Sequence, residues 1–369
     1  MNILWFTWKD LEHPLAGGAE VVTAELTKRL VQDGHNVQII SGGFNGAKRT
    51  TEQNGCKVVR VGGRLSVYWH AYRYYKKELA TQNWDIIIEE VNTIPFFTHW
   101  YTKSTKRFLF FHQLARQVWF YQMVFPLSIV GYVLEPMYLR LLRKSKVITV
   151  SNSTKQDLVK YGFKKENISI ISEGIDIEPL ALLANITKYS TPTILSLGAI
   201  RPMKRTLEIV KAFEILKESQ ADAELIIAGD KQGKYANTVL KYIKNSKYKN
   251  SIKVLGRVST EKKMELMQKS HLIAVTSIKE GWGLIVTEAN SQGTPAVVYN
   301  VDGLRDSVQD GITGLIATKN TPKSLAEAMR TALTDTTLYE RLRTQAWQWS
   351  KQITFEQSYK DFCKVVGIK

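Results

Sequence analysis

Residues 272–289 read LIAVTSIKEGWGLIVTEA: an apolar run, a glycine-rich turn and a second apolar run. Leu272–Thr276 is short and apolar, so it predicts a buried strand, and a helix is predicted to begin near Gly283. Glu280 lies in the turn before that helix, and Glu288 lies about one turn inside it. These carboxylates could contact two parts of one extended ligand, while the helix N-terminus between them attracts a phosphate. The alternative is an N-cap carboxylate followed by a solvated glutamate.

Short apolar runs alternate with helical patterns along the whole chain, and the alternation restarts near Thr193. The polar stretch Ala184–Pro192 before it is predicted to be a linker. Near-continuous apolar strands separated by helices are typical of parallel sheets covered on both faces. With 369 residues, too many for one ordinary core, the chain is predicted to have an α/β fold with two Rossmann-like, doubly wound domains. The predicted strands are Asn2–Trp8, Val37–Ser41, Lys57–Val61, Asp85–Val91, Phe108–His112, Val147–Ser151, Thr193–Leu197, Glu224–Ala228, Ile252–Leu255, Leu272–Thr276 and Ala296–Tyr299.

Two further strand-to-helix turns have the composition of ligand-binding loops. Residues 15–20 read LAGGAE, and the glycine pair allows the backbone to approach a ligand closely. Residues 197–205 read LGAIRPMKR and place three cations before a predicted helix, where a diphosphate would gain charge-assisted hydrogen bonds and the favourable helix dipole. The alternatives are a flexible turn for the first loop and a solvated basic turn for the second.

The formal net charge is +17, which favours polyanionic partners such as nucleic acid, anionic lipid or phosphorylated substrates. Much of the excess lies in residues 102–150, where eight lysines and arginines accompany one acid, Glu135. Residues 118–125 read VWFYQMVF, and a basic run follows at 140–144. Two interpretations are open: this segment docks on an anionic membrane surface, or it is a helical pair that lines the acceptor cleft.

Several features predict a cytoplasmic protein. The N-terminus lacks the basic region and cleavage site of a signal peptide. Prolines and charges interrupt Met123–Leu142, the nearest candidate for a membrane span. Cys56 and Cys363 lie far apart in sequence and are predicted to be reduced thiols. If the aromatic segment docks on lipid, the protein would be peripheral on the inner face of the cell membrane.

Taken together, these motifs resemble the retaining, GT-B-fold glycosyltransferases of family 4, over essentially the whole chain. The strongest match is EGWGLIVTEA at 280–289, followed by Gly293-Thr294-Pro295, which looks like the family's E-G-x-G-x-x-x-x-E-A signature and its G-T-P sequel. Three positions depart from the family pattern: Ala199 stands where an arginine is common, Glu173 replaces the usual asparagine, and Trp282 replaces the more frequent phenylalanine. Supporting matches are Gly17–Glu20, Lys204 after Gly198, Leu255–Val258, Val150-Ser151, Glu173–Asp176, Val301–Leu304 and Asp310–Gly314.

The resemblance implies a role for each matching residue. Lys204 would bind the donor diphosphate together with Arg201, which we infer takes the place of the missing arginine. Glu288 would hold the ribose hydroxyls, and Glu280 would contact the hydroxyls of the transferred sugar. The other implied donor contacts are Gly281, the amides of Gly283 and Leu284 at the diphosphate, Arg257 and Val258 at the base, and Gly18. On the acceptor side the resemblance implies Gly17, Gly18 and His112, and the catalytic group would be Glu280, His112 and Lys204.

The resemblance also implies the GT-B division of the chain, with the active site in a cleft between two domains. The predicted domains are an acceptor-binding domain at 1–183 and a nucleotide-sugar-binding domain at 184–345. Residues 346–369, with aromatic residues at helical spacings, would form a helix that crosses back to the first domain.

The expected reaction is a metal-independent, retaining transfer of a hexose-type sugar from a UDP- or GDP-sugar. The acceptor would be a cell-surface glycan, a polysaccharide or a lipid-linked molecule. No cofactor is expected, since the nucleotide sugar is a co-substrate, and cations with helix dipoles would neutralise the leaving diphosphate in place of a metal. One alternative is a GT-B sugar-nucleotide epimerase, which converts its donor without an acceptor. Another is a nucleic-acid-binding protein without catalysis, but the chain lacks a recognisable motif for it, so nucleic acid is not an expected partner.

Overall fold

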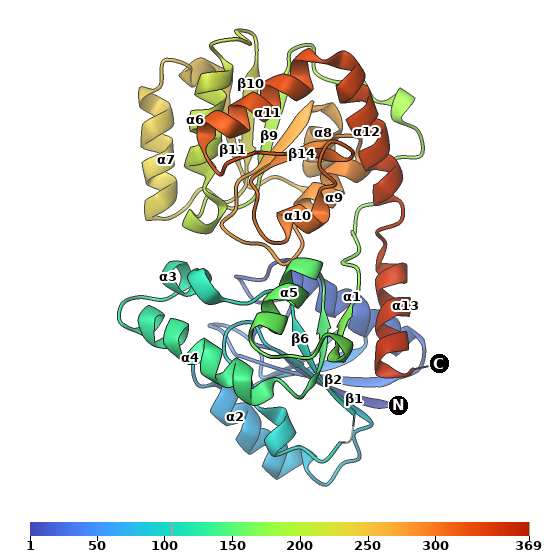
Figure 1. The fold of residues 1–369 in the computed structure, drawn as a ribbon. Coiled ribbons are helices and arrows are strands. Elements are labelled where there is room, and N and C mark those ends of the chain that lie inside the picture. The colour runs from blue at the N-terminus through green and yellow to red at the C-terminus, as the bar shows by residue number, and fades with distance from the viewer. Residues whose placement is uncertain (105, 369) are drawn as a thin grey trace. The chain divides into compact units, whose positions relative to one another are not determined.

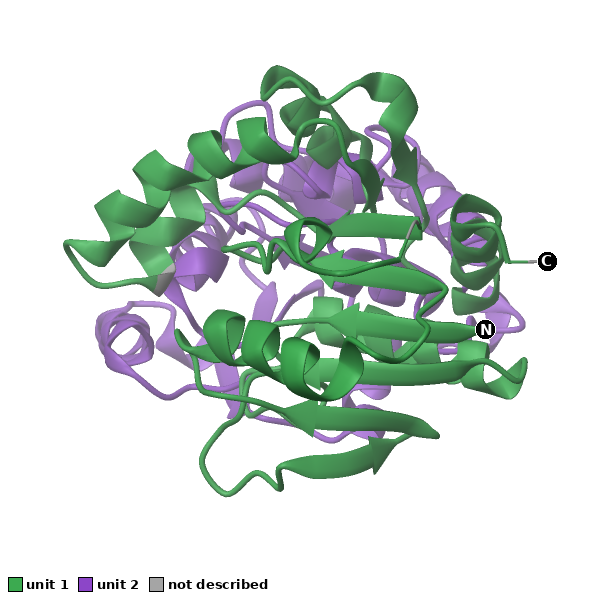
Figure 2. Ribbon diagram, turned by 90° about the horizontal axis from the view of Figure 1, so that it is seen from below, with its two compact units in different colours: residues 1–174, 355–369 green, residues 175–354 purple. Residues whose placement is uncertain are grey.

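The computed structural model of the protein describes residues 1–104 and 106–368. It forms two compact units, coloured separately in Figure 2. Unit 1 comprises residues 1–174 and 355–369, and unit 2 comprises residues 175–354.

Unit 1 is built around an eight-stranded sheet with the order β3-β4-β2-β1-β5-β6-β7-β8, labelled in part in Figure 1. Neighbouring strands are parallel except for the edge pair β3 and β4. The strands are β1 (Asn2–Phe6), β2 (Asn36–Ser41), β3 (Thr50–Gln53), β4 (Cys56–Arg60), β5 (Ile86–Glu90), β6 (Lys106–Phe111), β7 (Lys146–Thr149) and β8 (Ile168–Ile170).

Helices cover both faces of this sheet because successive strand side chains point to opposite sides. Leu4 and Phe6 pack in one apolar cluster with Ala71 of the α2 helix. Trp5 points the other way and stacks on Phe362 of α13, with ring centroids 5.7 Å apart. The helices of unit 1 are α1 (Gly18–Gln32), α2 (Val67–Tyr74) continued by the π-helix η1 (Tyr75–Leu79), α3 (Trp119–Gln122), α4 (Leu127–Leu142), α5 (Asn152–Lys160) and α13 (Phe355–Val366).

Unit 2 contains an all-parallel, six-stranded sheet with the order β11-β10-β9-β12-β13-β14. Ile194 and Leu195 are neighbours in β9 but belong to separate buried clusters, so this sheet is also covered on both faces. The strands are β9 (Thr193–Leu197), β10 (Glu224–Ala228), β11 (Ile252–Gly256), β12 (Leu272–Val275), β13 (Ala296–Val298) and β14 (Gly314–Ile316). The helices are α6 (Thr206–Leu216), α7 (Lys234–Asn245), α8 (Thr260–Lys269), α9 (Leu284–Ser291), α10 (Leu304–Ser307), α11 (Pro322–Thr334) and α12 (Thr336–Ser350).

Two doubly wound parallel-sheet units confirm the predicted fold class, but the predicted linker is wrong. Residues 184–192 belong to unit 2, and the units divide after Gly174 rather than after residue 183. The reason is the half-buried Lys188, whose Nζ donates to Ser270 O at 2.7 Å and to Gly293 O and Thr294 Oγ1 at 2.8 Å. The polar composition of residues 184–192 therefore suggested a linker, although the hydrogen bonds of Lys188 attach this stretch to the rest of unit 2.

The second boundary also differs from the prediction, and the residues predicted as one terminal helix form two. Trp347 lies in α12 and donates from Nε1 to Leu180 O at 2.8 Å, within unit 2. Unit 1 resumes at Phe355 rather than at residue 346, because the buried Ile353 and the β-bridge between Ile175 and Thr354 extend unit 2 beyond α12. The remaining helix, α13, packs against α1 within unit 1.

None of the helices in residues 1–104 and 106–368 has the length and apolar character needed to cross a bilayer.

Candidate active site

The turns after β9 and β12 lie together at the carboxyl edge of the unit 2 sheet, since these strands are neighbours. Thr276 Oγ1 donates to the backbone carbonyls of Lys204 at 2.9 Å and Arg205 at 3.1 Å. The amide of Ile278 donates to Met203 O at 2.9 Å. These bonds hold the turn at 197–205 against the segment that leads from β12 into the motif at 280–288.

Lys204 and Glu280 form the centre of this edge. Lys204 Nζ lies 2.5 Å from Glu280 Oε1, and Ser277 Oγ donates to the same oxygen at 2.5 Å. The Lys204 side chain is 38% exposed and that of Glu280 is 20% exposed, so both can meet a ligand. The arrangement presents an ammonium group and a carboxylate within reach of one small polar molecule.

The helix α9 begins beside this pair with its first amides open. Gly283 has φ +106° and precedes the first helical residue, Leu284, with no side-chain cap at this end. A Cβ on Gly283 would lie 3.0 Å from Leu304 Cδ2 and 3.0 Å from Ser307 Oγ. Only glycine fits this turn without strain, and the uncapped amides together with the helix dipole favour an anion.

Glu288 lies farther along α9 as a half-buried carboxylate with Lys263 as its cationic partner. Lys263 Nζ is 2.6 Å from Glu288 Oε2. Burial raises the pKa of Glu288, whereas the charge and hydrogen bond of Lys263 act to lower it. An acid kept in such a place can accept hydrogen bonds from ligand hydroxyls.

Other predicted donor contacts surround the ends of β9, β10 and β11. Arg257 Nη2 donates to Asp230 Oδ2 at 3.1 Å, and this bond is the main cause of the lowered pKa of Asp230. The charge of Arg201 also lowers that pKa, while Arg201 itself is exposed. Val258 is half-buried and packs against the apolar cluster that contains β12. Arg257, Arg201 and Asp230 thus form one charged group beside Lys204.

In unit 1, His112 follows β6 and is held by Glu173, to which the sequence analysis assigned no role. His112 Nδ1 donates to Glu173 Oε1 at 3.0 Å, and both side chains are buried. Nε2 is buried and has no hydrogen-bond partner in the described part of the chain. Burial acts to lower the pKa of His112, but the hydrogen bond to Glu173 and the charges of Glu173, Glu90 and Glu20 outweigh it and raise that pKa.

The missed partners had weak signals in the sequence. Glu173 departs from the family's asparagine, and its pairing with His112 gives that departure a structural reason. Glu90 ends the apolar run of β5, is fully buried, and accepts from Trp5 Nε1 at 2.8 Å, Thr7 Oγ1 at 2.7 Å and Thr23 Oγ1. For Glu90, the available signal in the sequence was an acid at the end of a buried apolar strand. Lys263, on α8, belongs to no recognisable sequence motif.

The glycine pair at the start of α1 differs from the turn before α9. The Gly17 amide donates to Glu20 Oε2 at 2.6 Å, and Lys9 Nζ lies 3.2 Å from Glu20 Oε1. The Gly17 amide is therefore already hydrogen-bonded to a carboxylate of the same chain. Gly18 is the first residue of the helix.

Residues 1–104 and 106–368 contain no group of three or more His, Cys, Asp or Glu side chains placed to hold an ion. The predicted residues of unit 2 instead gather cations and amides around one edge.

Comparison with known proteins agrees with this architecture. Residues 16–179 match the family model for Glycosyltransferase Family 4, and residues 185–349 match that for Glycosyl transferases group 1. The chain is 23% identical over 347 residues to N-acetyl-alpha-D-glucosaminyl L-malate synthase of Bacillus anthracis, covering 90% of this chain and 89% of that protein.

Solved structures share the fold. A glycosyltransferase from Rickettsia africae superimposes with a TM-score of 0.77 at 21% identity, covering 99% of this chain and 97% of that one. Anabaena HepE, crystallised with UDP and glucose, gives a TM-score of 0.74 at 17% identity, covering 100% and 99%. With two family models that together span most of its length and the two-unit architecture of these enzymes, the chain belongs to the GT-B glycosyltransferases of the family 4 type.

Proposed function

We propose that this glycosyltransferase moves a hexose-type sugar from a UDP- or GDP-sugar to a cell-surface glycan, polysaccharide or lipid-linked acceptor, with retention and without a metal. The observation that carries the proposal is the pair of Lys204 and Glu280 beside the uncapped start of α9. An ammonium group and open amides suit a diphosphate, and a carboxylate suits sugar hydroxyls.

In the proposed reaction, the bond between the anomeric carbon and the diphosphate oxygen breaks, and the acceptor oxygen bonds to that carbon on the same face. The acceptor's hydroxyl proton passes to the leaving diphosphate. Lys204, Arg201 and the amides of Gly283 and Leu284 stabilise the negative charge that develops there. The remaining roles stay as the resemblance implies: Glu288 at the ribose, Glu280 and Gly281 at the sugar, Arg257 and Val258 at the base, and Gly17, Gly18 and His112 on the acceptor side. The donor contact that the resemblance also implies for Gly18 is not kept, because the Glu20 carboxylate lies at that turn.

UDP is the first donor to test. HepE, which shares the fold, was crystallised with UDP and with UDP-glucose. The helix-terminal diphosphate site does not select the base, so GDP-sugars remain in the proposal.

We also propose that the protein is cytoplasmic and docks on the inner face of an anionic membrane through α3 and α4. The most exposed apolar side chains of the segment include Val124 at 74%, Phe125 at 78% and Leu141 at 63%. The cations Arg140, Arg143 and Lys144 follow at the end of α4. Large exposed apolar side chains beside cations suit the headgroup region of an anionic bilayer.

A thermal-shift screen with UDP-, GDP- and ADP-sugars tests the donor assignment. A ligand at about 100 times its dissociation constant adds roughly 2.7 kcal/mol to the stability of a folded state that alone binds it. Lys204→Ala and Glu288→Ala should each strongly reduce the shift, whereas Lys9→Ala should keep it. A shift retained in both site variants would contradict the assignment, and turnover of the donor without acceptor would favour the epimerase.

Co-sedimentation with phosphatidylglycerol-containing vesicles at low salt tests the docking surface. Val133→Ser with Met137→Ser should leave the protein in the supernatant, since both side chains are 56% exposed on α4. Ile312→Ser, at an apolar residue of unit 2 that is 49% exposed, is the matched control. Equal recovery of the native chain with and without vesicles would end this part of the proposal.

A further inference from the structure

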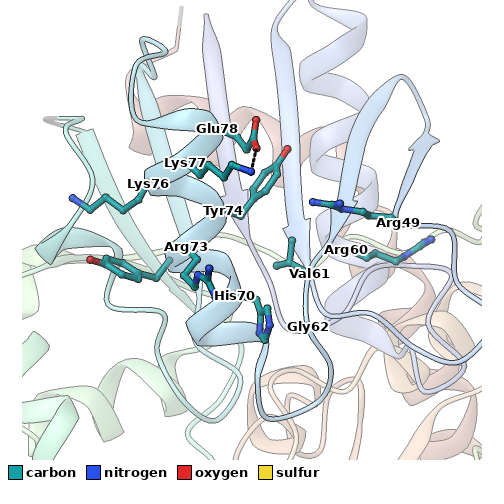
Figure 3. A pocket seen from close by; sticks show the side chains of 11 residues that line it. Arg49, Arg60, Val61, Gly62, His70, Arg73, Tyr74, Lys76, Lys77 and Glu78 are labelled. Atoms are coloured by element: carbon teal, nitrogen blue, oxygen red, sulfur yellow. Dashed lines mark ion pairs between the residues drawn. The ribbon is translucent and has the colours of Figure 1, made fainter.

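Unit 1 contains a hollow of about 630 Å³ that has no role in the proposed transfer (Figure 3). One wall is formed by α2 and η1, and the other by the ends of β3 and β4. We call it the α2–β4 pocket. Its size is in the range of small-molecule sites.

The pocket walls carry cations without matching acids. The side chains of Arg49 and Arg73 make no hydrogen bond or ion pair with any residue that the structure describes. Lys77 Nζ reaches Glu78 Oε1 at 3.7 Å, and both side chains are strongly exposed. Such a pair contributes little and leaves the lysine available.

Arg60, at the end of β4 on the strand side of the same pocket, is already neutralised and serves as a contrast. Its guanidinium lies 2.7 Å and 2.8 Å from the two oxygens of Asp10, and 2.8 Å from Glu12 Oε2. The unbalanced charge therefore comes from Arg49, Arg73 and Lys77, and from Lys76, whose Nζ lies over the Tyr72 ring.

These three cations come from opposite walls. Figure 3 shows Arg49 on the β3–β4 side, Arg73 and Lys77 on the helical side, and Tyr74 between them. His70 Nδ1 donates to Ser66 O at 2.9 Å, which leaves its Nε2 as an acceptor for a ligand hydroxyl. A group between the walls would meet two guanidinium groups and an ammonium group.

We propose that the α2–β4 pocket binds a phosphate-bearing group, either on a soluble phosphorylated saccharide or in a phospholipid headgroup. Guanidinium groups match phosphate oxygens in a bidentate manner, and cations on two sides can contact a tetrahedral anion from both.

The pocket is a separate site and not part of the reacting centre. It lies at β4, whereas His112 follows β6, and the order β4-β2-β1-β5-β6 separates them by four strand spacings. At about 4.8 Å per spacing this is roughly 19 Å. A phosphate bound here therefore belongs to a remote part of an extended acceptor, or to a headgroup that anchors the protein.

The test compares the full chain with the triple variant Arg49→Gln, Arg73→Gln, Lys77→Gln. The matched control, Lys234→Gln, Lys241→Gln, Lys244→Gln, removes the same charge from exposed positions on α7. Calorimetry with inorganic pyrophosphate at low salt gives the soluble arm, and sedimentation with phosphatidylglycerol vesicles gives the headgroup arm. We expect the pocket variant to lose at least about tenfold in affinity in one arm, and the control to lose less than about twofold.

A loss with pyrophosphate alone identifies a soluble phosphorylated ligand, and a loss with vesicles identifies a headgroup. Equal affinities of the pocket variant and the control in both arms would overturn the proposal. The thermal shift with UDP-sugar should persist in the pocket variant, which separates this site from the proposed donor site. If the triple variant melts early, Arg73→Gln alone, at an exposed position, gives the same comparison.

Discussion

Two glycine-containing turns open a helix in this protein, and they differ in what covers the helix N-terminus. Before α1, the Gly17 amide is bonded to Glu20, which is in turn paired with Lys9. Before α9, Gly283 leaves the helix without a side-chain cap, beside Lys204. Neither helix has a side-chain cap on its first-turn amides, but an acid of the chain lies on the N-cap amide of α1, which we call the closed terminus, whereas α9 begins beside the Lys204 ammonium group, which we call the open one. We infer that the donor diphosphate binds at the open one.

The largest expected effect comes from the lysines beside the two termini. Lys204→Ala should weaken UDP binding by roughly 10- to 100-fold, because one charged hydrogen bond contributes about 1.5–3 kcal/mol. Lys9→Ala should leave the affinity unchanged, since Lys9 neutralises a carboxylate of its own chain. Titration calorimetry measures the UDP affinity of both variants. Similar losses of affinity in Lys204→Ala and Lys9→Ala would contradict the distinction between the two turns.

Alanine at the two glycines should separate the turns by stability. Gly283→Ala should lower the free energy of unfolding by about 1–3 kcal/mol, since φ is +106° there and the new Cβ meets atoms at 3.0 Å. Gly17 has φ −145°, and its Cβ would lie 3.7 Å from the nearest atom, so Gly17→Ala should cost below about 0.5 kcal/mol. Chemical denaturation of both variants checks this, and a larger cost at Gly17 would contradict the backbone account.

Opening the closed terminus should cost stability without affecting the donor. Glu20→Ala removes the group that covers the Gly17 amide and should lower the free energy of unfolding by about 1 kcal/mol. UDP affinity should stay at the native value. If it falls as far as in Lys204→Ala, the α1 turn belongs to the donor site after all.

The smallest expected effect is a pH-dependent one at His112. Its pKa is raised in the folded state, so its contribution to stability is fully present below the unfolded pKa of about 6.5 and is lost as pH rises through the folded pKa. Glu173→Gln should lower the pKa of His112, while Glu90 and Glu20 still face it.

The melting temperature of Glu173→Gln should therefore fall below the native one on the acid side of about pH 6.5, and the gap should narrow at higher pH. Nuclear magnetic resonance titration of His112 gives the pKa directly. A gap that does not change with pH would leave Glu173 with a packing role alone.

The sequence predicted the strands that carry continuous apolar runs. Thr193–Leu197 and Glu224–Ala228 coincide with β9 and β10. It missed β3, whose residues Thr-Thr-Glu-Gln are polar because this strand lies at a sheet edge with exposed side chains. It also misplaced the unit boundary, because a polar stretch around Lys188 is held by partly buried hydrogen bonds.

The site was predictable where its residues form local motifs. The Lys204 and Glu280 turns adjoin because β9 and β12 are neighbours, which follows from a topology that a single sequence does not specify. Glu173 and His112 are 61 positions apart, and Lys263 reaches Glu288 from another helix. The α2–β4 pocket likewise brings together Arg49 and Arg73, which are distant in sequence, so no local sequence motif predicts it.

Amide hydrogen exchange with and without UDP tests the central claim most directly, because it observes both helix termini in one experiment. We predict that UDP slows exchange in the first turn of α9, at Leu284–Val286, and leaves the first turn of α1 unchanged. Protection at Gly18–Val21 with none at α9 would contradict the account.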